Sequence, residues 1–348
     1  MTRAAAKSPM IERILAGPVL IDAHAHVGAD AAAFCSGNYP YAITAEDFVL
    51  RLDLTGVDYA ACFPLVYTAY FSLPDFVHNR FVRSSGDLSP IPYGLENERL
   101  CQEIFEAMPA VAERLLPFAF FDPGREPEAQ VSALESLVAR YPVYGLKSAT
   151  SYLQSHSTEL LRGGRCLLDF AARHNLPVTL HTAVIPGDPW ANVFEILKVV
   201  RARPDVRFAL AHTCRFDRRA LDEADSLANC FVDFSAFHIH CKLAQQNHAA
   251  VASGPDRFPA DYTRHAAAMQ AIAEAYPETM LWGSDTPGHQ FIGRFVDDRG
   301  EEHWMHLTCE RRRETDEFRQ LPDALRDRIG YRNTVRYLFG QEAVEARA

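Results

Sequence analysis

The chain has 348 residues, 48% of them hydrophobic, and carries a formal net charge of −10 at pH 7. A chain of this length can bury one large core or two ordinary ones, which excludes a small disulfide-stapled module. The negative charge, together with the lack of a dense run of lysine and arginine, argues against nucleic acid or an anionic membrane as the main partner.

The eight cysteines are scattered singly, without the close pairs of zinc ribbons or redox motifs. This usage predicts reduced thiols in a cytoplasmic protein. No apolar run approaches the length of a membrane span. The N-terminal stretch contains Glu12 and lacks the continuous apolar core of an export signal.

Short apolar runs alternate with helical patterns along the chain. We predict eight strands, at residues 19–26, 57–63, 115–121, 143–147, 177–181, 206–212, 230–235 and 279–285. We predict helices between them, at residues 44–54, 96–113, 127–140, 158–174, 189–203, 218–227 and 261–276. This alternation favours an α/β fold, a parallel (β/α)8 barrel of the TIM type, over an open doubly wound sheet.

Long connections and a helical tail extend this barrel. Residues 64–95 are rich in aromatic residues and proline and show no clear period, so we expect a substrate lid there. The long loop after Asp285 is a second candidate lid, with Phe291, Arg294, His303, Trp304 and His306. Amphipathic patterning predicts C-terminal helices at about 315–340, outside the barrel. We expect one domain over residues 1–348, with the barrel core at about 19–290.

Metal-ligating residue types gather where the predicted strands end. His24 and His26 alternate along the first strand, so both side chains point to the same side. A lone His-x-His pair is weak evidence, because such histidines are often only hydrogen-bonded. Active sites of these barrels lie at the carboxyl ends of the strands. Four further polar side chains end other strands: Lys147, His181, His212 and Asp285.

Each of these residues alone has a structural explanation, such as a hydrogen-bonded rim histidine, a helix cap or a surface lysine. Together, three histidines and a carboxylate around one centre favour a metal site with nitrogen and oxygen ligands. Such a site suits Zn²⁺, Mn²⁺ or Fe²⁺ better than Ca²⁺, which prefers more oxygen ligands.

Several segments resemble motifs of the amidohydrolase superfamily, in particular the amidohydrolase-2 branch, which includes enzymes of the aminocarboxymuconate-semialdehyde decarboxylase type. They are IDAHAHVG, GLKSA, VTLHTA, ALAHT, LWGSD and the closing GYRNTVRYLFG. The resemblance spans Leu20 to Gly340. It implies a metal-dependent enzyme, although members of this superfamily catalyse different reactions.

Carried over residue by residue, the resemblance assigns roles to the strand-end side chains. It implies four metal ligands, namely His24, His26, His181 and Asp285. It implies that His212 polarises or deprotonates a reacting group. Lys147 could be carbamylated and bridge two ions, or could serve substrate binding or packing; we expect one ion rather than two. Zinc is the first expectation, with manganese and iron as alternatives.

Three functions remain open at this stage. The first is hydrolysis of an amide, cyclic amide or lactone in a small, anionic molecule. There Asp285 would take a proton from water and His212 would stabilise developing charge. The second is non-oxidative decarboxylation of an aromatic or unsaturated acid. The third is a non-catalytic barrel that acts as a binding subunit, which the intact motif residues argue against.

Candidates for substrate binding are supported less directly. Arg215 could contact a charged substrate, or could belong to a salt-bridged loop. For His238 and its neighbour His240 we expect one buried and one exposed side chain. His289, Tyr67 and Arg83 come from the two candidate lids. Barrels of this kind often form homodimers, but no interface stripe is evident in the sequence.

Overall fold

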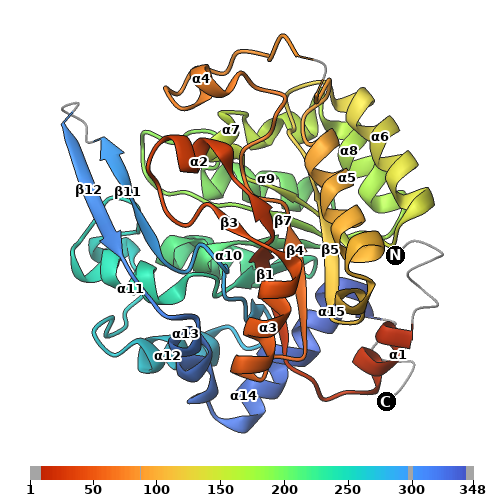
Figure 1. Cartoon of the computed structure of the whole chain (residues 1–348). Helices are drawn as coiled ribbons and strands as arrows, with labels where there is room; N and C mark the ends of the chain where they lie inside the picture. Colours follow the sequence, from red (N-terminus) through yellow and green to blue (C-terminus); the bar gives the residue numbers. More distant parts are fainter. Residues whose placement is uncertain (1–8, 87, 297–300, 342–348) are drawn as a thin grey trace.

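Eight parallel strands form one sheet in the order β1-β4-β5-β6-β7-β8-β9-β10 (Figure 1). The computed structural model describes residues 9–86, 88–296 and 301–341. The strands are β1 Ile21–His26, β4 Tyr59–Phe63, β5 Leu115–Phe120, β6 Gly145–Ser148, β7 Val178–Leu180, β8 Phe208–Leu210, β9 Cys230–Asp233 and β10 Met280–Leu281. Each lies within, or within one residue of, a strand predicted from the sequence.

The last strand returns to the first and closes the sheet. The Ala23 amide donates to the Trp282 carbonyl at 3.0 Å, and the Asp285 amide donates to the His24 carbonyl at 2.7 Å. Further along, the His26 amide donates to the Thr286 carbonyl at 2.6 Å. These bonds join β1 to the segment that follows β10. The predicted (β/α)8 barrel is therefore confirmed.

Helices surround the barrel between successive strands. The main ones are α3 Ala45–Thr55, α5 Gly94–Gln102, α6 Pro127–Arg140, α8 Arg165–Arg173, α9 Val193–Ala202, α10 Arg218–Asp225 and α12 His265–Ala275. Three of them, α3, α9 and α10, begin with a side-chain N-cap. The Thr44 hydroxyl, for example, accepts from the Asp47 amide at 3.1 Å and caps α3. In the described part of the chain, no helix is long and apolar enough to span a bilayer.

Two predicted helices are interrupted within their predicted bounds. The helix predicted at 96–113 stops as α5 at Gln102 and continues as π and 3₁₀ turns at Glu103–Ala107 and Pro109–Glu113. Pro109 lacks an amide hydrogen, so it cannot continue an α-helical ladder. The helix predicted at 158–174 becomes α8 only from Arg165, because two glycines at 163–164 interrupt the pattern.

Several helices were not predicted. A helix α1 Pro9–Ala16 precedes the barrel, and α11 Phe237–Gln245 follows β9 directly. The second candidate lid is an antiparallel hairpin of β11 Phe291–Val296 and β12 Glu302–Leu307, which projects at the left of Figure 1. The C-terminal helices predicted at about 315–340 are present as α13 Arg311–Arg319, α14 Asp323–Asp327, a π turn Arg328–Arg332 and α15 Asn333–Phe339.

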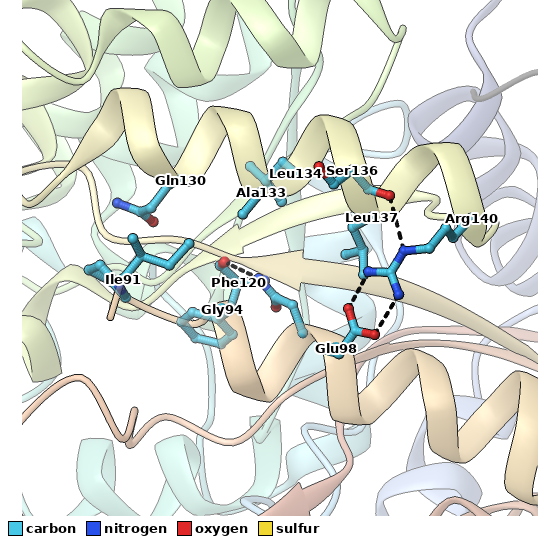
Figure 2. A pocket seen from close by; sticks show the side chains of 12 residues that line it. Ile91, Gly94, Glu98, Phe120, Gln130, Ala133, Leu134, Ser136, Leu137 and Arg140 are labelled. Carbon is cyan, nitrogen blue, oxygen red and sulfur yellow. Dashed lines mark hydrogen bonds and ion pairs between the residues drawn. The ribbon is translucent and has the colours of Figure 1, made fainter. Parts of the chain in front are cut away.

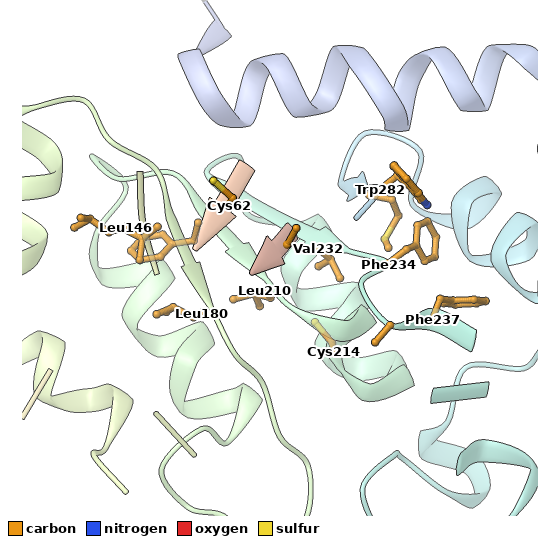
Figure 3. Close-up of a cluster of buried hydrophobic side chains, with 14 of the residues drawn as sticks. Cys62, Leu146, Leu180, Leu210, Cys214, Val232, Phe234, Phe237 and Trp282 are labelled. Atoms are coloured by element: carbon orange, nitrogen blue, oxygen red, sulfur yellow. The ribbon is translucent and has the colours of Figure 1, made fainter. Parts of the chain in front are cut away.

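Side chains of the strands alternate between two cores. Outward-facing residues such as Cys62, Leu146, Leu180 and Val232 pack in one large hydrophobic cluster with the surrounding helices (Figure 3). The inward-facing cluster includes Phe63, Phe118, Phe231 and residues of α1 and α15. The Tyr337 hydroxyl of α15 lies 2.7 Å from the Thr179 hydroxyl of β7. Helix α15 thus packs against the inner residues and leaves the polar strand ends for the site.

Candidate metal centre

Strand β1 carries two imidazoles, and hydrogen bonds at Nδ1 fix the orientation of each ring. The His24 Nδ1 lies 2.8 Å from Asp233 Oδ2, and the His26 Nδ1 lies 2.7 Å from the Pro64 carbonyl oxygen. Because both partners are acceptors, each Nδ1 carries the hydrogen. The Nε2 lone pairs are therefore available to a ligand. This is the arrangement by which proteins usually hold metal-binding histidines.

Asp285 completes a group of three donors. Its Oδ1 lies 3.3 Å from His24 Nε2 and 3.6 Å from His26 Nε2. Its backbone φ is 59°, in the left-handed region, and the amide bond to His24 holds it there. A Cβ added at Gly283 would lie 2.8 Å from the Cβ of His24, so only glycine allows this close approach.

The electrostatics of this group favour a cation. Burial and Lys147 act to lower the pKa of His24, but the carboxylates of Asp233 and Asp285 outweigh them and raise it. Burial opposes ionisation of Asp285 as well, yet His24 and His26 hold the pKa of that carboxyl at about 2. The two carboxylates thus stabilise positive charge beside His24, which a divalent ion would supply.

Lys147 lies at the same centre. Its Nζ lies 3.4 Å from His24 Nε2 and 5.2 Å from the centroid of the Phe63 ring. Burial lowers the pKa of Lys147 to about 8. The side chain is 1% exposed, so it is an interior residue rather than a surface lysine.

His181 and His212 form a hydrogen-bonded chain with Arg215. The Arg215 Nη2 donates to His181 Nε2 at 2.8 Å, so His181 carries its hydrogen on Nδ1. That Nδ1 lies 3.0 Å from His212 Nε2, and His212 Nδ1 lies 3.2 Å from the Ser235 carbonyl. The structure therefore brings three of the four expected ligands together. His181 lies beside them, bonded to Arg215 and His212.

An unusual backbone turn positions His212 and Arg215. Residues 212–216 all have φ between 47° and 63°, although none of them is glycine. Each such residue costs roughly 1–2 kcal/mol, so the surrounding contacts must hold the turn in place. The Asp233 carboxylate accepts from the His212 amide at 3.0 Å, and Arg215 donates to the Thr182 carbonyl at 2.7 Å.

Sequence reasoning missed the residues that hold the centre together. Asp233 ends β9 and contacts both His24 and the His212 amide. Asp22 accepts from the Ser284 amide at 2.8 Å and from Arg311 at 3.0 Å, and both side chains are buried. A polar residue inside an apolar strand was the available signal for Asp22 and Asp233. The sequence offers no such signal for Arg311, which is the first of three consecutive arginines.

Of the remaining substrate-binding candidates, His289 has a ring nitrogen without a partner among the described residues, whereas Tyr67 and Arg83 each contact another residue. His289 is buried, and its Nδ1 is without a hydrogen-bond partner in the described structure. Tyr67 donates to the Phe71 carbonyl at 2.9 Å, within its own loop. Arg83 is exposed and lies 3.5 Å from Glu126.

His238 and His240 differ from expectation. The expectation that one of the two is exposed is wrong, because helix α11 buries both side chains. His240 faces the centre, where its Nε2 accepts from Arg215. His238 faces α12 and α13 instead, where it contacts His265 and Glu317.

A separate cavity of about 140 Å³ lies between α5 and α6 (Figure 2). At one end the Arg140 guanidinium donates two hydrogen bonds to the Glu98 carboxylate. Further in, the Asn97 amide donates to the Phe120 carbonyl at 2.9 Å. The lining contains no histidine, so the cavity offers no alternative to the centre at the strand ends.

The donor set fits a divalent metal ion. His24, His26 and Asp285 each offer one ligand atom, and these atoms all lie within 4.8 Å of one another. Two imidazole nitrogens and a carboxylate oxygen suit a first-row ion. Three protein ligands of this kind leave a coordination position for water or substrate, as in catalytic rather than structural sites.

Comparisons with known proteins agree with this arrangement. The family model Amidohydro_2, described as amidohydrolase, matches residues 21–340. No curated protein matches the chain significantly. Among solved structures, a protein named putative 2-pyrone-4,6-dicarboxylic acid hydrolase from Pseudomonas putida is similar, with 17% identity and a TM-score of 0.55 over 92% of this chain and 97% of that one.

Two further structures share the fold. A protein named probable 2-pyrone-4,6-dicarboxylic acid hydrolase from Acinetobacter baumannii, with citric acid bound, has 15% identity and a TM-score of 0.55, over 93% of this chain and 100% of its own. An amidohydrolase from Burkholderia multivorans has 11% identity and a TM-score of 0.56, over 92% and 99%. With the family match over nearly its whole length, the chain belongs to the amidohydrolase family of enzymes, which generally depend on a metal ion.

Proposed function

We propose that the protein is a metal-dependent hydrolase that cleaves a C–N or C–O bond in a small, anionic amide, cyclic amide or lactone. The convergence of His24, His26 and Asp285, with both imidazoles held through Nδ1, carries the proposal. A divalent ion at these residues would polarise a substrate oxygen and lower the pKa of a bound water molecule. We propose zinc, with manganese or iron as alternatives.

The residues around the ion would perform the proton transfers. Asp285 is ionised at neutral pH, because His24 outweighs burial and holds its pKa at about 2. It can accept the proton of the attacking water and return it to the leaving group. Burial keeps His212 neutral, with a pKa well below its usual range. His212 would stabilise charge on the substrate oxygen, and His181 would become a fourth ligand if its ring turned away from Arg215.

The surroundings of Arg215 favour an anionic substrate. Its guanidinium donates to His181, to His240 and to the Thr182 carbonyl, all of which are neutral groups. Within the described residues no carboxylate forms an ion pair with it. A half-buried guanidinium without an acidic partner is poorly stabilised, so a substrate carboxylate would complete the site. The names of two similar structures, which specify a pyrone dicarboxylic acid, make carboxylated lactones the first class to test.

The reaction class can be tested directly. Purified protein with added Zn²⁺, Mn²⁺ or Fe²⁺ should hydrolyse at least one member of a panel of carboxylated lactones, cyclic amides and amides. Hydrolysis would be followed by acid release, and CO₂ would be measured in parallel on aromatic and unsaturated acids. Release of CO₂ without hydrolysis of any panel member would contradict the proposal and assign a decarboxylase.

Replacement of Arg215 should weaken binding of the carboxylate. For Arg215→Met, KM for a carboxylated substrate is expected to rise roughly 10- to 100-fold, because one charge-assisted hydrogen bond is lost. Arg215→Lys should recover part of the loss. The matched control is an ester or amide of the same substrate that lacks the carboxylate, for which KM should change little. An equal rise in KM for both substrates would argue against carboxylate recognition.

A further inference from the structure

A second group of ligand-type side chains lies outside the barrel, where helices α11, α12 and α13 meet. His238 comes from α11, His265 begins α12 and Glu317 lies in α13. Their side chains are 2%, 8% and 8% exposed. None of them is a member of the barrel centre.

The three ligand atoms surround one point. His238 Nδ1 lies 2.6 Å from His265 Nδ1, and Glu317 Oε1 lies 3.2 Å from the first and 3.3 Å from the second. Three atoms at these separations are all about 2 Å from a common point just outside their plane, which is the usual Zn–N and Zn–O bond length. Two imidazole nitrogens that face each other also leave at least one lone pair without a hydrogen, because only one can donate.

The charges suit a cation. Burial opposes ionisation of Glu317, but hydrogen bonds from His238 and His265 outweigh it and hold the pKa at about 2. Burial also lowers the pKa of His238. The carboxylate is therefore ionised and this imidazole neutral near pH 7, which are the forms that bind metals. Arg313 Nε lies 3.2 Å from Glu317 Oε1, but its side chain is 63% exposed and can turn into solvent.

A second acidic side chain, Glu314, lies beside His238. Glu314 lies one helical turn before Glu317, and its Oε1 accepts from the His238 amide at 3.0 Å. Its Oε2 is buried and has no hydrogen-bond partner in the described structure. Burial raises the pKa of Glu314 and so favours the neutral acid, which does not compete with Glu317 for the ion. Glu314 and Glu317 are three residues apart and lie on the same side of α13.

We propose that His238, His265 and Glu317 bind one divalent transition-metal ion, of the zinc type, at a site separate from the barrel centre. Such an ion would join three helices, two of which also contact the barrel centre. Helix α11 also carries His240, which accepts from Arg215, and α13 carries Arg311, which pairs with Asp22. Binding of an ion to Nδ1 of His265 would place the hydrogen of this ring on Nε2. The Gln245 amide nitrogen, which lies 3.1 Å from Nε2 and also donates to the Tyr262 carbonyl at 2.6 Å, would then have to move away from Nε2.

Metal content per chain tests the proposal on the full-length protein. After saturation with Zn²⁺ and dialysis, elemental analysis should give two equivalents for the wild type. Glu317→Gln and His265→Gln should each lose one equivalent, and so should the double variant His24→Ala with His26→Ala. Combining Glu317→Gln with the double variant should remove both ions. His78→Gln, at an exposed histidine, is the control and should keep two.

The variants separate the two sites. If Glu317→Gln and His265→Gln keep the wild-type content, the proposal is overturned. It is also overturned if the second equivalent disappears only in Lys147→Met, since that ion would lie in the barrel. Should Glu317→Gln fail to fold, the double histidine variant still decides, because it must bind one Zn²⁺ and melt at a higher temperature with the ion than without it. Failure of the proposed function would instead appear as unchanged metal content in the double histidine variant.

Discussion

Replacing both His24 and His26 with alanine is expected to remove the ion of the barrel centre and to lower turnover at least about 10³-fold. The two imidazoles supply two of the three donor atoms that converge, and their Nδ1 bonds to Asp233 and Pro64 orient Nε2 toward the centre. With one carboxylate left, the centre cannot hold a first-row ion tightly.

Metal content and turnover should be measured on the same preparation, with far-ultraviolet circular dichroism to confirm the fold. His78→Ala, at an exposed histidine, is the matched control and should leave both quantities unchanged. Metal content equal to that of the wild type in the double variant would contradict the assignment of these ligands. Normal turnover without the ion would contradict metal-dependent hydrolysis.

The barrel could be predicted because each of its strands is a local signal. Runs such as those at residues 19–26, 143–147 and 279–285 are short and apolar and end in a polar residue, so both the strand and its polar end can be recognised in the sequence. Parallel strands then bring all the ends to one face. The approximate position of the centre follows from the topology alone.

The supporting residues could not be predicted, because they act across long separations in sequence. Arg311 looks like part of a solvated basic cluster, yet it is buried against Asp22. His238 and His240 are two residues apart, but the turn of α11 directs one to the outer helices and the other to Arg215. Helix α11 has no capping side chain at Ala236, so the sequence contains no N-cap signal for its start.

The position of His181 could be predicted from the sequence, but the orientation of its ring could not. Its position at the end of β7 follows from the strand pattern, and the resemblance to amidohydrolases implies a ligand there. Ring orientation, however, depends on neighbours. Arg215 comes from a left-handed turn at residues 212–216 that no sequence pattern predicts, and its guanidinium fixes the hydrogen on His181. The role of His181 therefore stays a proposal that rests on chemistry rather than on this geometry.

Asp285→Asn is expected to keep the fold and to lower kcat roughly 10²- to 10⁴-fold, the usual contribution of a positioned acid–base group. The amide has the shape of the carboxylate but cannot accept a proton at neutral pH. Asparagine also tolerates the left-handed backbone at this position, where φ is 59°, better than other residues with a side chain. The loss should therefore be one of chemistry rather than of stability.

The measurement is kcat at saturating substrate and metal, with bound metal and melting temperature determined alongside. Asp323→Asn is the control, since that side chain is 94% exposed and far along the chain in α14. A fall in kcat with metal retained would separate proton transfer from metal binding, because the asparagine oxygen can still act as a weak ligand. Near-normal kcat with metal retained would refute the proton-transfer role and leave Asp285 as a ligand only. The proton acceptor would then have to be sought at His212, whose Nε2 faces His181 at 3.0 Å.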